Sequence, residues 1–378
     1  MSNMIAFLGG GVPASYLSAS SFGDDSSASS PRSSSSSSLS PLPLQEAFEQ
    51  GSPRVLRKSL SAPNTDPNEI DEDGNTLLHK AAKQRLRRLI AVLLEDTRVR
   101  VNVRNTQGET PLYIACFSGD SRTVKMLTKH STVDANIRSY IGVSPLHLVC
   151  TGGFERCLSL LLRVKSLDEN YAFRGETALY TACKNGQHRC VSGLLSRRTI
   201  KVNDGDFRGN TPLHISCRLG HHRCISALFR AKGLRENSLN DRGQTGLHVA
   251  CEYGYSRCVW ALSFTRISPN IRDLGQNTAL HAAARSGKEG CVYALFNFFG
   301  EIRINSLNVK RETALDTAAH LGSAFIVDKL LTVEDIELSS LALYYLAQKD
   351  IYPDRNVLLR TRGRTTDWLK ENSAIFYR

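Results

Sequence analysis

The fold of this chain is indicated most clearly by Asp206-Phe207-Arg208-Gly209-Asn210-Thr211-Pro212-Leu213-His214. The first four residues have the composition of a turn, with a glycine where a positive φ is expected. Thr211 is suited to cap a helix, and Pro212 fits its first turn. That helix should end at Gly220. A second helix should follow it, with an apolar stripe formed by Cys224, Ile225, Leu228 and Phe229.

The same pattern recurs along the chain with one period. The marker leucine is found at Leu78, Leu112, Leu146, Leu179, Leu213, Leu247, Leu280 and Leu315, at intervals of 34, 34, 33, 34, 34, 33 and 35 residues. Seven residues later stands Gly119, Gly153, Gly186, Gly220, Gly254, Gly287 or Gly322. An asparagine closes the units at Asn102, Asn136, Asn170, Asn203, Asn237, Asn270 and Asn305. Helices this short are unstable alone in water, so the units must stack.

The helix starts resemble a known family. Thr211-Pro212-Leu213-His214, Ser144-Pro145-Leu146-His147 and Thr278-Ala279-Leu280-His281 are similar to the Thr-Pro-Leu-His signature of ankyrin repeats. The resemblance implies an all-α solenoid with a β-turn and two antiparallel helices per unit, protein–protein recognition and no shared catalytic site. The expected units are 71–104, 105–138, 139–171, 172–205, 206–239, 240–272, 273–307 and 308–332.

The terminal units depart from the repeat pattern. Arg85 replaces the glycine of the first unit, and the last unit has Arg311 in its turn and Asp316 in place of histidine. Such departures are expected of units that cap an array.

Two flanking regions differ from the repeats. Residues 1–65 are rich in Ser and Pro, with an unbroken serine run from Ser33 to Ser38, and are expected to be disordered. Residues 333–378 are expected to form a helical cap and a basic tail. The cap should cover the eighth unit with Ile336, Leu341, Tyr345 and Leu346.

The recurring cysteine pair resembles repeats of the ankyrin-plus-SOCS-box family, whose C-terminal tail recruits a ubiquitin ligase. A substrate receptor of such a ligase, bound to elongins B and C, is therefore an alternative function. Ser340-Leu341 is loosely placed for the recruiting helix, but the cysteine and the proline-rich segment of that motif are missing.

Charge and hydropathy limit the partners. There are 48 basic and 36 acidic residues, a net charge of +12, which favours proteins with acidic or phosphorylated segments. Nucleic-acid binding is a weaker alternative because no base-reading module is present. No apolar run is long enough for a membrane span. Met1–Ala14 has no basic residue, unlike a secretory signal, so we expect an intracellular protein of the cytoplasm or nucleus.

All ten cysteines fall in two ladders. They stand four residues after the marker leucine, at Cys116, Cys150, Cys183, Cys217 and Cys251, or eleven after it, at Cys157, Cys190, Cys224, Cys258 and Cys291. Ala82, Leu89, Ala319 and Ile326 fill the same positions elsewhere, which indicates small apolar core positions. We therefore expect buried reduced thiols. The spacing is not the usual one for zinc, and no metal site is expected.

The histidines also repeat. His79, His147, His214, His248 and His281 follow the marker leucine, with Tyr113, Tyr180 and Asp316 in the same position elsewhere. A repeated residue near each helix start indicates a structural role. No nucleophile elbow, P-loop or metalloprotease motif is present, so we expect neither an enzyme nor a cofactor.

The ankyrin resemblance places the partner on the turn tips and the outward face of each first helix. At these positions aromatic and apolar side chains alternate with basic ones, the residue types that dominate binding energy at interfaces. The expected binding residues are Tyr140, Phe173, Arg174, Lys184, Phe207, Arg208, Arg218, Leu219, Arg242, Tyr253 and Arg285.

A further row of arginines begins the second helices at Arg88, Arg122, Arg156, Arg189, Arg223 and Arg257. The favoured interpretation is packing and electrostatic support between neighbouring helices. The alternative is a basic stripe for an acidic partner on another face.

One short segment resembles a phosphoserine motif. Arg57-Lys58-Ser59-Leu60-Ser61-Ala62-Pro63 is similar to sites that 14-3-3 proteins bind, although Lys58 stands where arginine is usual. Phosphorylation of Ser61 would place a strongly charged acceptor in a segment expected to be flexible.

Overall fold

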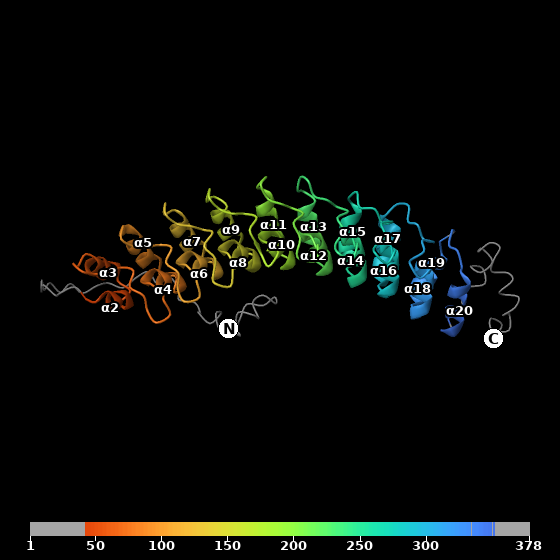
Figure 1. Ribbon diagram of the computed structural model, residues 1–378, viewed down its shortest axis with the longest axis horizontal. Coiled ribbons are helices and arrows are strands. Elements are labelled where there is room, and N and C mark those ends of the chain that lie inside the picture. The colour runs from red at the N-terminus through yellow and green to blue at the C-terminus, as the bar shows by residue number, and fades with distance from the viewer. Residues whose placement is uncertain (1–41, 334, 350, 352–378) are drawn as a thin grey trace, which may run out of the picture.

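The computed structural model describes residues 42–333, 335–349 and 351, and it shows a gently curved stack of helix pairs (Figure 1). The even-numbered helices lie below the odd-numbered ones in this view, from the N-terminal units in red to the C-terminal units in blue. Neighbouring pairs make the main tertiary contacts, so the apolar core runs through the stack from end to end.

Each pair consists of a first and a second helix. The first helices are α2 (Leu44–Glu49), α4 (Leu77–Lys83), α6 (Pro111–Phe117), α8 (Pro145–Gly152), α10 (Ala178–Lys184), α12 (Pro212–Arg218), α14 (Gly246–Tyr253), α16 (Ala279–Arg285) and α18 (Ala314–Leu321). The second helices are α3 (Pro53–Leu60), α5 (Arg87–Glu95), α7 (Ser121–Thr128), α9 (Glu155–Leu161), α11 (His188–Leu195), α13 (His222–Leu228), α15 (Ser256–Ser263), α17 (Glu289–Phe298) and α19 (Ala324–Leu331). The pairs from α4/α5 to α18/α19 are the eight expected units, numbered one to eight below.

The helices begin where the sequence predicts. Thr211 has extended backbone angles as N-cap, its side chain and that of His214 form a capping box, and Pro212 opens α12. Several first helices end at a glycine in the left-handed conformation, such as Gly254, whose φ is 82°. Arg85 adopts the same conformation in unit one, with a φ of 57°, which costs energy for a residue with a side chain.

The closing asparagines join each unit to the next. The side-chain amide of each donates to a backbone carbonyl of the following unit at 2.7–3.3 Å. Its side-chain oxygen accepts from the backbone N–H of the residue two positions after that carbonyl, at 2.7–3.1 Å. This repeated bridge satisfies polar backbone groups between the stacked units and explains the asparagine ladder.

The expectation of disorder over residues 1–65 is wrong for its last part. α2 and α3 form a helix pair that buries Leu44, Phe48, Leu56 and Leu60 on unit one. Residues 1–41, including the serine run, lie outside the described residues. Ser and Pro are concentrated before residue 42, whereas the apolar residues that follow have helical spacing.

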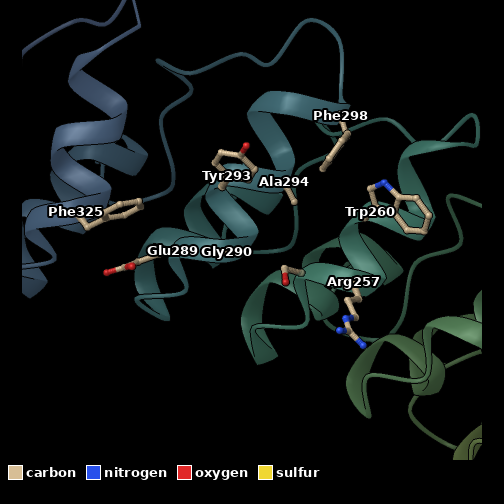
Figure 2. Close-up of a pocket in the computed structure, with 9 residues that line it drawn as sticks. Arg257, Trp260, Glu289, Gly290, Tyr293, Ala294, Phe298 and Phe325 are labelled. Carbon is tan, nitrogen blue, oxygen red and sulfur yellow. The ribbon is translucent and has the colours of Figure 1, made fainter.

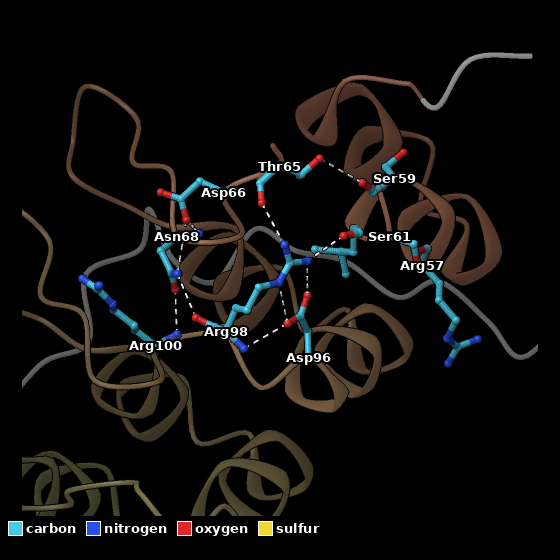
Figure 3. A network of polar contacts seen from close by, with 10 residues as sticks. Arg57, Ser59, Ser61, Thr65, Asp66, Asn68, Asp96, Arg98 and Arg100 are labelled. Carbon is cyan, nitrogen blue, oxygen red and sulfur yellow. Dashed lines mark hydrogen bonds and ion pairs between the residues drawn. The ribbon is translucent and has the colours of Figure 1, made fainter. Parts of the chain in front are cut away.

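The N-terminal pair is a further unit of the array. Asn68 makes the same bridge as the later asparagines, donating to the carbonyl of Arg98 at 2.9 Å and accepting from the N–H of Arg100 at 2.6 Å (Figure 3). Arg98 also donates to the carbonyls of Leu60 and Thr65. The sequence carried the signal, because Leu44, Gly51 and Asn68 keep the same offsets of seven and 24 residues as the ladders.

At the C-terminal end of the stack, where a cap is expected, α20 (Ser340–Gln348) packs on α18. Ile336, Leu343 and Leu346 are buried there, whereas the expected Leu341 and Tyr345 are only half-buried. Asp316, which replaces the histidine of unit eight, accepts from the Ser339 hydroxyl and so ties the cap to the stack. The basic tail beyond residue 351 lies outside the described residues.

Candidate protein-binding surface

The turn tips are built by short local hydrogen bonds. The Asp206 carboxylate accepts from the backbone N–H groups of Arg208 and Asn210, each at 2.9 Å. The Tyr180 hydroxyl donates to the same carboxylate at 2.8 Å. These bonds to the ionised form help to hold the pKa of Asp206 below its usual value, although burial opposes them. The tip residues Phe207 and Arg208 are thereby directed to solvent.

Backbone hydrogen bonds also join successive tips. The N–H of Asp241 donates to the carbonyl of Arg208 at 3.0 Å, and the N–H of Leu274 donates to the carbonyl of Arg242 at 3.0 Å. In unit four the turn closes as a two-residue hairpin, in which β1 (Ala172–Phe173) pairs with β2 (Glu176–Thr177). Where these bonds occur, the joined tips form an edge on which the side chains keep a fixed order.

We call the eleven expected binding residues the binding strip. At its turn tips, Phe207 and Tyr140 are 81% and 66% exposed, and Arg174, Arg208 and Arg242 are exposed as well. Phe173 differs, because it is half-buried beside Val143 and meets the His147 ring edge-on. Phe173 therefore supports the tip of unit three.

The helix members of the binding strip are less uniform. Leu219, Tyr253 and Arg285 are exposed, and Arg218 is half-buried. Lys184 is half-buried and donates to the Glu176 carboxylate at 2.7 Å, so part of its charge is neutralised. Arg242 has only a 4.0 Å contact to Glu252, and its side chain stays largely exposed.

The histidine ladder is structural. In four units the histidine Nδ1 accepts from the N–H of the N-cap threonine at 3.1–3.2 Å. In all five, Nε2 donates to a backbone carbonyl of the next unit at 2.8–3.2 Å. Burial lowers the pKa of all five, so the ring is held neutral as an intra- and inter-unit bridge.

The cysteine ladders are buried free thiols, as the sequence predicts. The first ladder of one unit lies beside the second ladder of the next, as Cys183 lies beside Cys224. Burial raises the pKa of Cys157 to about 11 and of Cys190 to about 12. A thiol held protonated inside the stack is a packing group rather than a nucleophile.

A family model described as "Ankyrin repeats (3 copies)" matches residues 44–140, 131–206 and 198–273, which together are more than half of the 378 residues. This chain belongs to the ankyrin-repeat family. Ankyrin repeats are generally protein–protein interaction modules and are typically non-catalytic. The match begins at Leu44 and so includes the N-terminal pair.

Two solved structures of ankyrin repeats are similar to this chain. The human ASB11 ankyrin repeat domain has 24% identity and a TM-score of 0.48, over 63% of this chain and 98% of that one. The ankyrin repeat domain of Bcl-3, described as a unique member of the IkappaB protein family, has 24% identity and a TM-score of 0.52, over 60% and 100%. At these identities the likeness shows the fold alone. Comparison of the sequence with curated proteins finds no match.

The binding strip predicted from the sequence leaves out two exposed apolar side chains at the turn tips of units seven and eight. Leu274 and Val309 occupy the same turn position as Phe207 and are 73% and 65% exposed. Between units seven and eight, Val309, Lys310, Arg285 and His320 border a hollow of about 260 Å³. The shared turn position was the available signal, and it was overlooked because these two side chains are aliphatic.

The expectation that Ser61 lies in a flexible segment is wrong. It is the exposed C-cap of α3, and its hydroxyl donates to the carbonyl of Arg57 at 2.9 Å (Figure 3). Ser59 and Leu60 of the same motif are buried. A partner that reads this motif in an extended form would have to unwind the end of α3.

Within the described residues, no group of three or more His, Cys, Asp or Glu side chains could hold a metal ion. No helix in the same part of the chain is long and apolar enough to cross a membrane.

Proposed function

We propose that this protein is a scaffold or adaptor that holds an acidic or phosphorylated segment of another protein on the binding strip. The proposal rests on the exposed side chains at the turn tips of units three to six. There, the rings of Tyr140 and Phe207 are exposed. The tip arginines Arg174, Arg208 and Arg242 are exposed as well, and their charge is little neutralised. An aromatic ring supplies apolar contact area, and a neighbouring guanidinium pairs with carboxylates or phosphates.

The test reverses two charges at the centre of the strip. Arg208→Glu with Arg242→Glu should remove the partners that the full-length tagged protein captures from cells, as measured by quantitative mass spectrometry. Arg230→Glu with Lys232→Glu is the matched control, because both residues lie in the loop after α13 and away from the strip. An unchanged set of captured proteins in the first variant would show that the strip is not the site.

The ligase-receptor alternative depends on the C-terminal tail. α20 buries Leu343 and Leu346 on the stack, so this helix acts as a cap, and residues 352–378 lie outside the described part. Recovery of elongins B and C in the same purification would support the alternative. Binding of DNA or RNA that weakens with salt would support the nucleic-acid alternative.

Phosphorylation of Ser61 with 14-3-3 binding stays a prediction. A phosphate at the C-terminus of α3 would face the negative end of the helix dipole, which favours unwinding of the last turn. Intact-mass analysis of residues 57–63 from cells, followed by 14-3-3 binding to the phosphorylated full-length protein, tests it. We also propose an intracellular location, because all ten cysteines are free thiols and disulfides are typical of oxidising, extracellular compartments.

A further inference from the structure

A second set of arginines lies on the second helices, away from the binding strip. The second position of seven successive second helices is occupied by Arg54, Arg88, Arg122, Arg156, Arg189, Arg223 and Arg257. We call this set the arginine row. All seven arginines are exposed. This exposure favours a binding role for the row over packing support between helices.

The arginine row keeps most of its charge. Within the described residues its one ion pair joins Arg189 Nη1 to Glu155 Oε2 at 3.7 Å, and the Arg189 side chain is still 74% exposed. An exposed pair of this kind contributes little binding energy and is easily exchanged for another carboxylate. Because one guanidinium recurs per stacked unit, the row is a regularly spaced basic stripe.

The row ends at an apolar groove. Trp260 on α15, Tyr293 and Phe298 on α17, and Phe325 on α19 line a hollow of about 450 Å³, with Arg257 at its edge (Figure 2). We call it the aromatic groove. These four rings are between 43% and 53% exposed. A cluster of exposed rings on a water-facing helix surface indicates a binding site.

The sequence changes where the row meets the groove. Three residues after the row position, units three to five have Ser159, Ser192 and Ser226, whereas units six and seven have Trp260 and Tyr293. The row position itself changes from Arg257 to Gly290 and then to Phe325. One edge of the second-helix face is thus basic with small neighbours, and the other is aromatic.

We propose that this face binds an acidic polypeptide segment that carries one large aromatic or aliphatic residue near one end. Its carboxylates pair with the arginine row, and its apolar residue enters the aromatic groove. Arginine and aromatic side chains are the groups that contribute most at protein interfaces. The site shares no residue with the binding strip, so the two faces can hold two segments at once.

Charge on the same face favours a polypeptide over a nucleic acid. Glu289 lines the aromatic groove, and Glu155 stands among the arginines. Every nucleotide carries a phosphate, so a strand laid along the face would meet both carboxylates. A polypeptide has negative charge only at its acidic side chains and can present a neutral residue at Glu289. Figure 2 shows the Glu289 side chain between Phe325 and Gly290.

The test uses the full-length protein and a fluorescein-labelled peptide with a run of Asp and Glu residues followed by one Trp. Binding is measured by fluorescence anisotropy. Arg156→Glu, Arg189→Glu and Arg223→Glu together should raise the Kd by more than about tenfold. Trp260→Ala with Tyr293→Ala should raise it by about tenfold, a loss of about 1.4 kcal/mol. Arg230→Glu with Lys232→Glu, in the loop after α13 and outside the strip, the row and the groove, should leave it within about twofold.

A second peptide localises the apolar contact. When Gly replaces the Trp of the probe, the loss caused by Trp260→Ala with Tyr293→Ala should shrink to less than about twofold, because the two changes remove one contact. Circular dichroism melts confirm that each variant is folded, since all the substituted residues are exposed.

Four results would overturn the proposal. The first is that the acidic probe does not bind, or that its Kd is the same for the triple arginine variant, the groove variant and the unaltered protein. The others are tighter binding of oligouridine, tighter binding of a synthetic peptide of residues 352–378, and self-association that the groove variant abolishes. These would assign the face to nucleic acid, to the chain's own terminus and to a second copy, respectively. Because the binding strip is intact in these variants, failure here leaves the proposed function standing.

Discussion

The five ladder histidines accept at Nδ1 and donate at Nε2, so a proton on Nδ1 breaks a buried contact. Burial holds their folded-state pKa below the ordinary value of 6.5. The unfolded chain therefore binds more protons, and stability is complete above about pH 6.5 and falls as the pH drops through the folded-state values. We expect the urea midpoint to fall steadily from pH 7 to pH 5.

The matched variant for this prediction is His214→Gln. It should lower stability at pH 7 by about 1–2 kcal/mol through lost hydrogen bonds. It should also reduce the dependence of the midpoint on pH, because one of the five buried groups no longer titrates. A midpoint that stays constant between pH 7 and pH 5 would contradict the role given to the ladder.

Gly108 tests the close approach of successive turn tips. Its φ is 76°, and a Cβ there would lie 2.6 Å from the backbone nitrogen of Tyr140. Gly108→Ala should cost about 1–2 kcal/mol in backbone strain and roughly 1–3 kcal/mol more for the displaced tip. Gly233→Ala is the control, with a φ of 82° and no atom within 4 Å of the added Cβ. Equal losses in thermal melts would show that the tips do not press on each other.

At the scale of elements, the N-terminal pair of α2 and α3 is a unit of the array that the Ser- and Pro-rich composition of residues 1–65 did not indicate. Leu56 of α3 is fully buried on unit one, so Leu56→Ala should cost about 2–5 kcal/mol for the terminal unit. Hydrogen exchange should show the loss first in α2 and α3. Arg54→Ala on the exposed face of α3 is the control and should change exchange little. Fast exchange of α3 already in the unaltered protein would mean that this pair is not stably docked.

On the scale of the whole molecule, each unit is stabilised mainly by its two neighbours. Such arrays behave approximately as a line of coupled units, so one weak unit can separate the two sides. Leu179→Ala in unit four removes a side chain that is 1% exposed and should cost about 2–5 kcal/mol. We expect hydrogen exchange in moderate urea to show units on the two sides of α10 opening at different concentrations. A single concerted loss of protection along the array would contradict this expectation.

The sequence by itself determined the period, the helix starts and the terminating glycines, because these depend on bonds within about four residues. Thr211 and His214 cap a helix from their spacing alone, and Gly254 ends one from its lack of a Cβ. The buried positions of the cysteines followed from the same periodicity.

Only the tertiary structure decided which side chains are free to bind a partner. Phe173 and Phe207 share a turn position, yet one is half-buried against unit three and the other faces solvent. The exposure of the arginine row, the aromatic groove and the pairing of Lys184 with Glu176 also emerged there. The physical reason is that exposure and charge pairing depend on groups brought close by stacking, many of them about one unit away in the chain, and local propensity does not report on those groups.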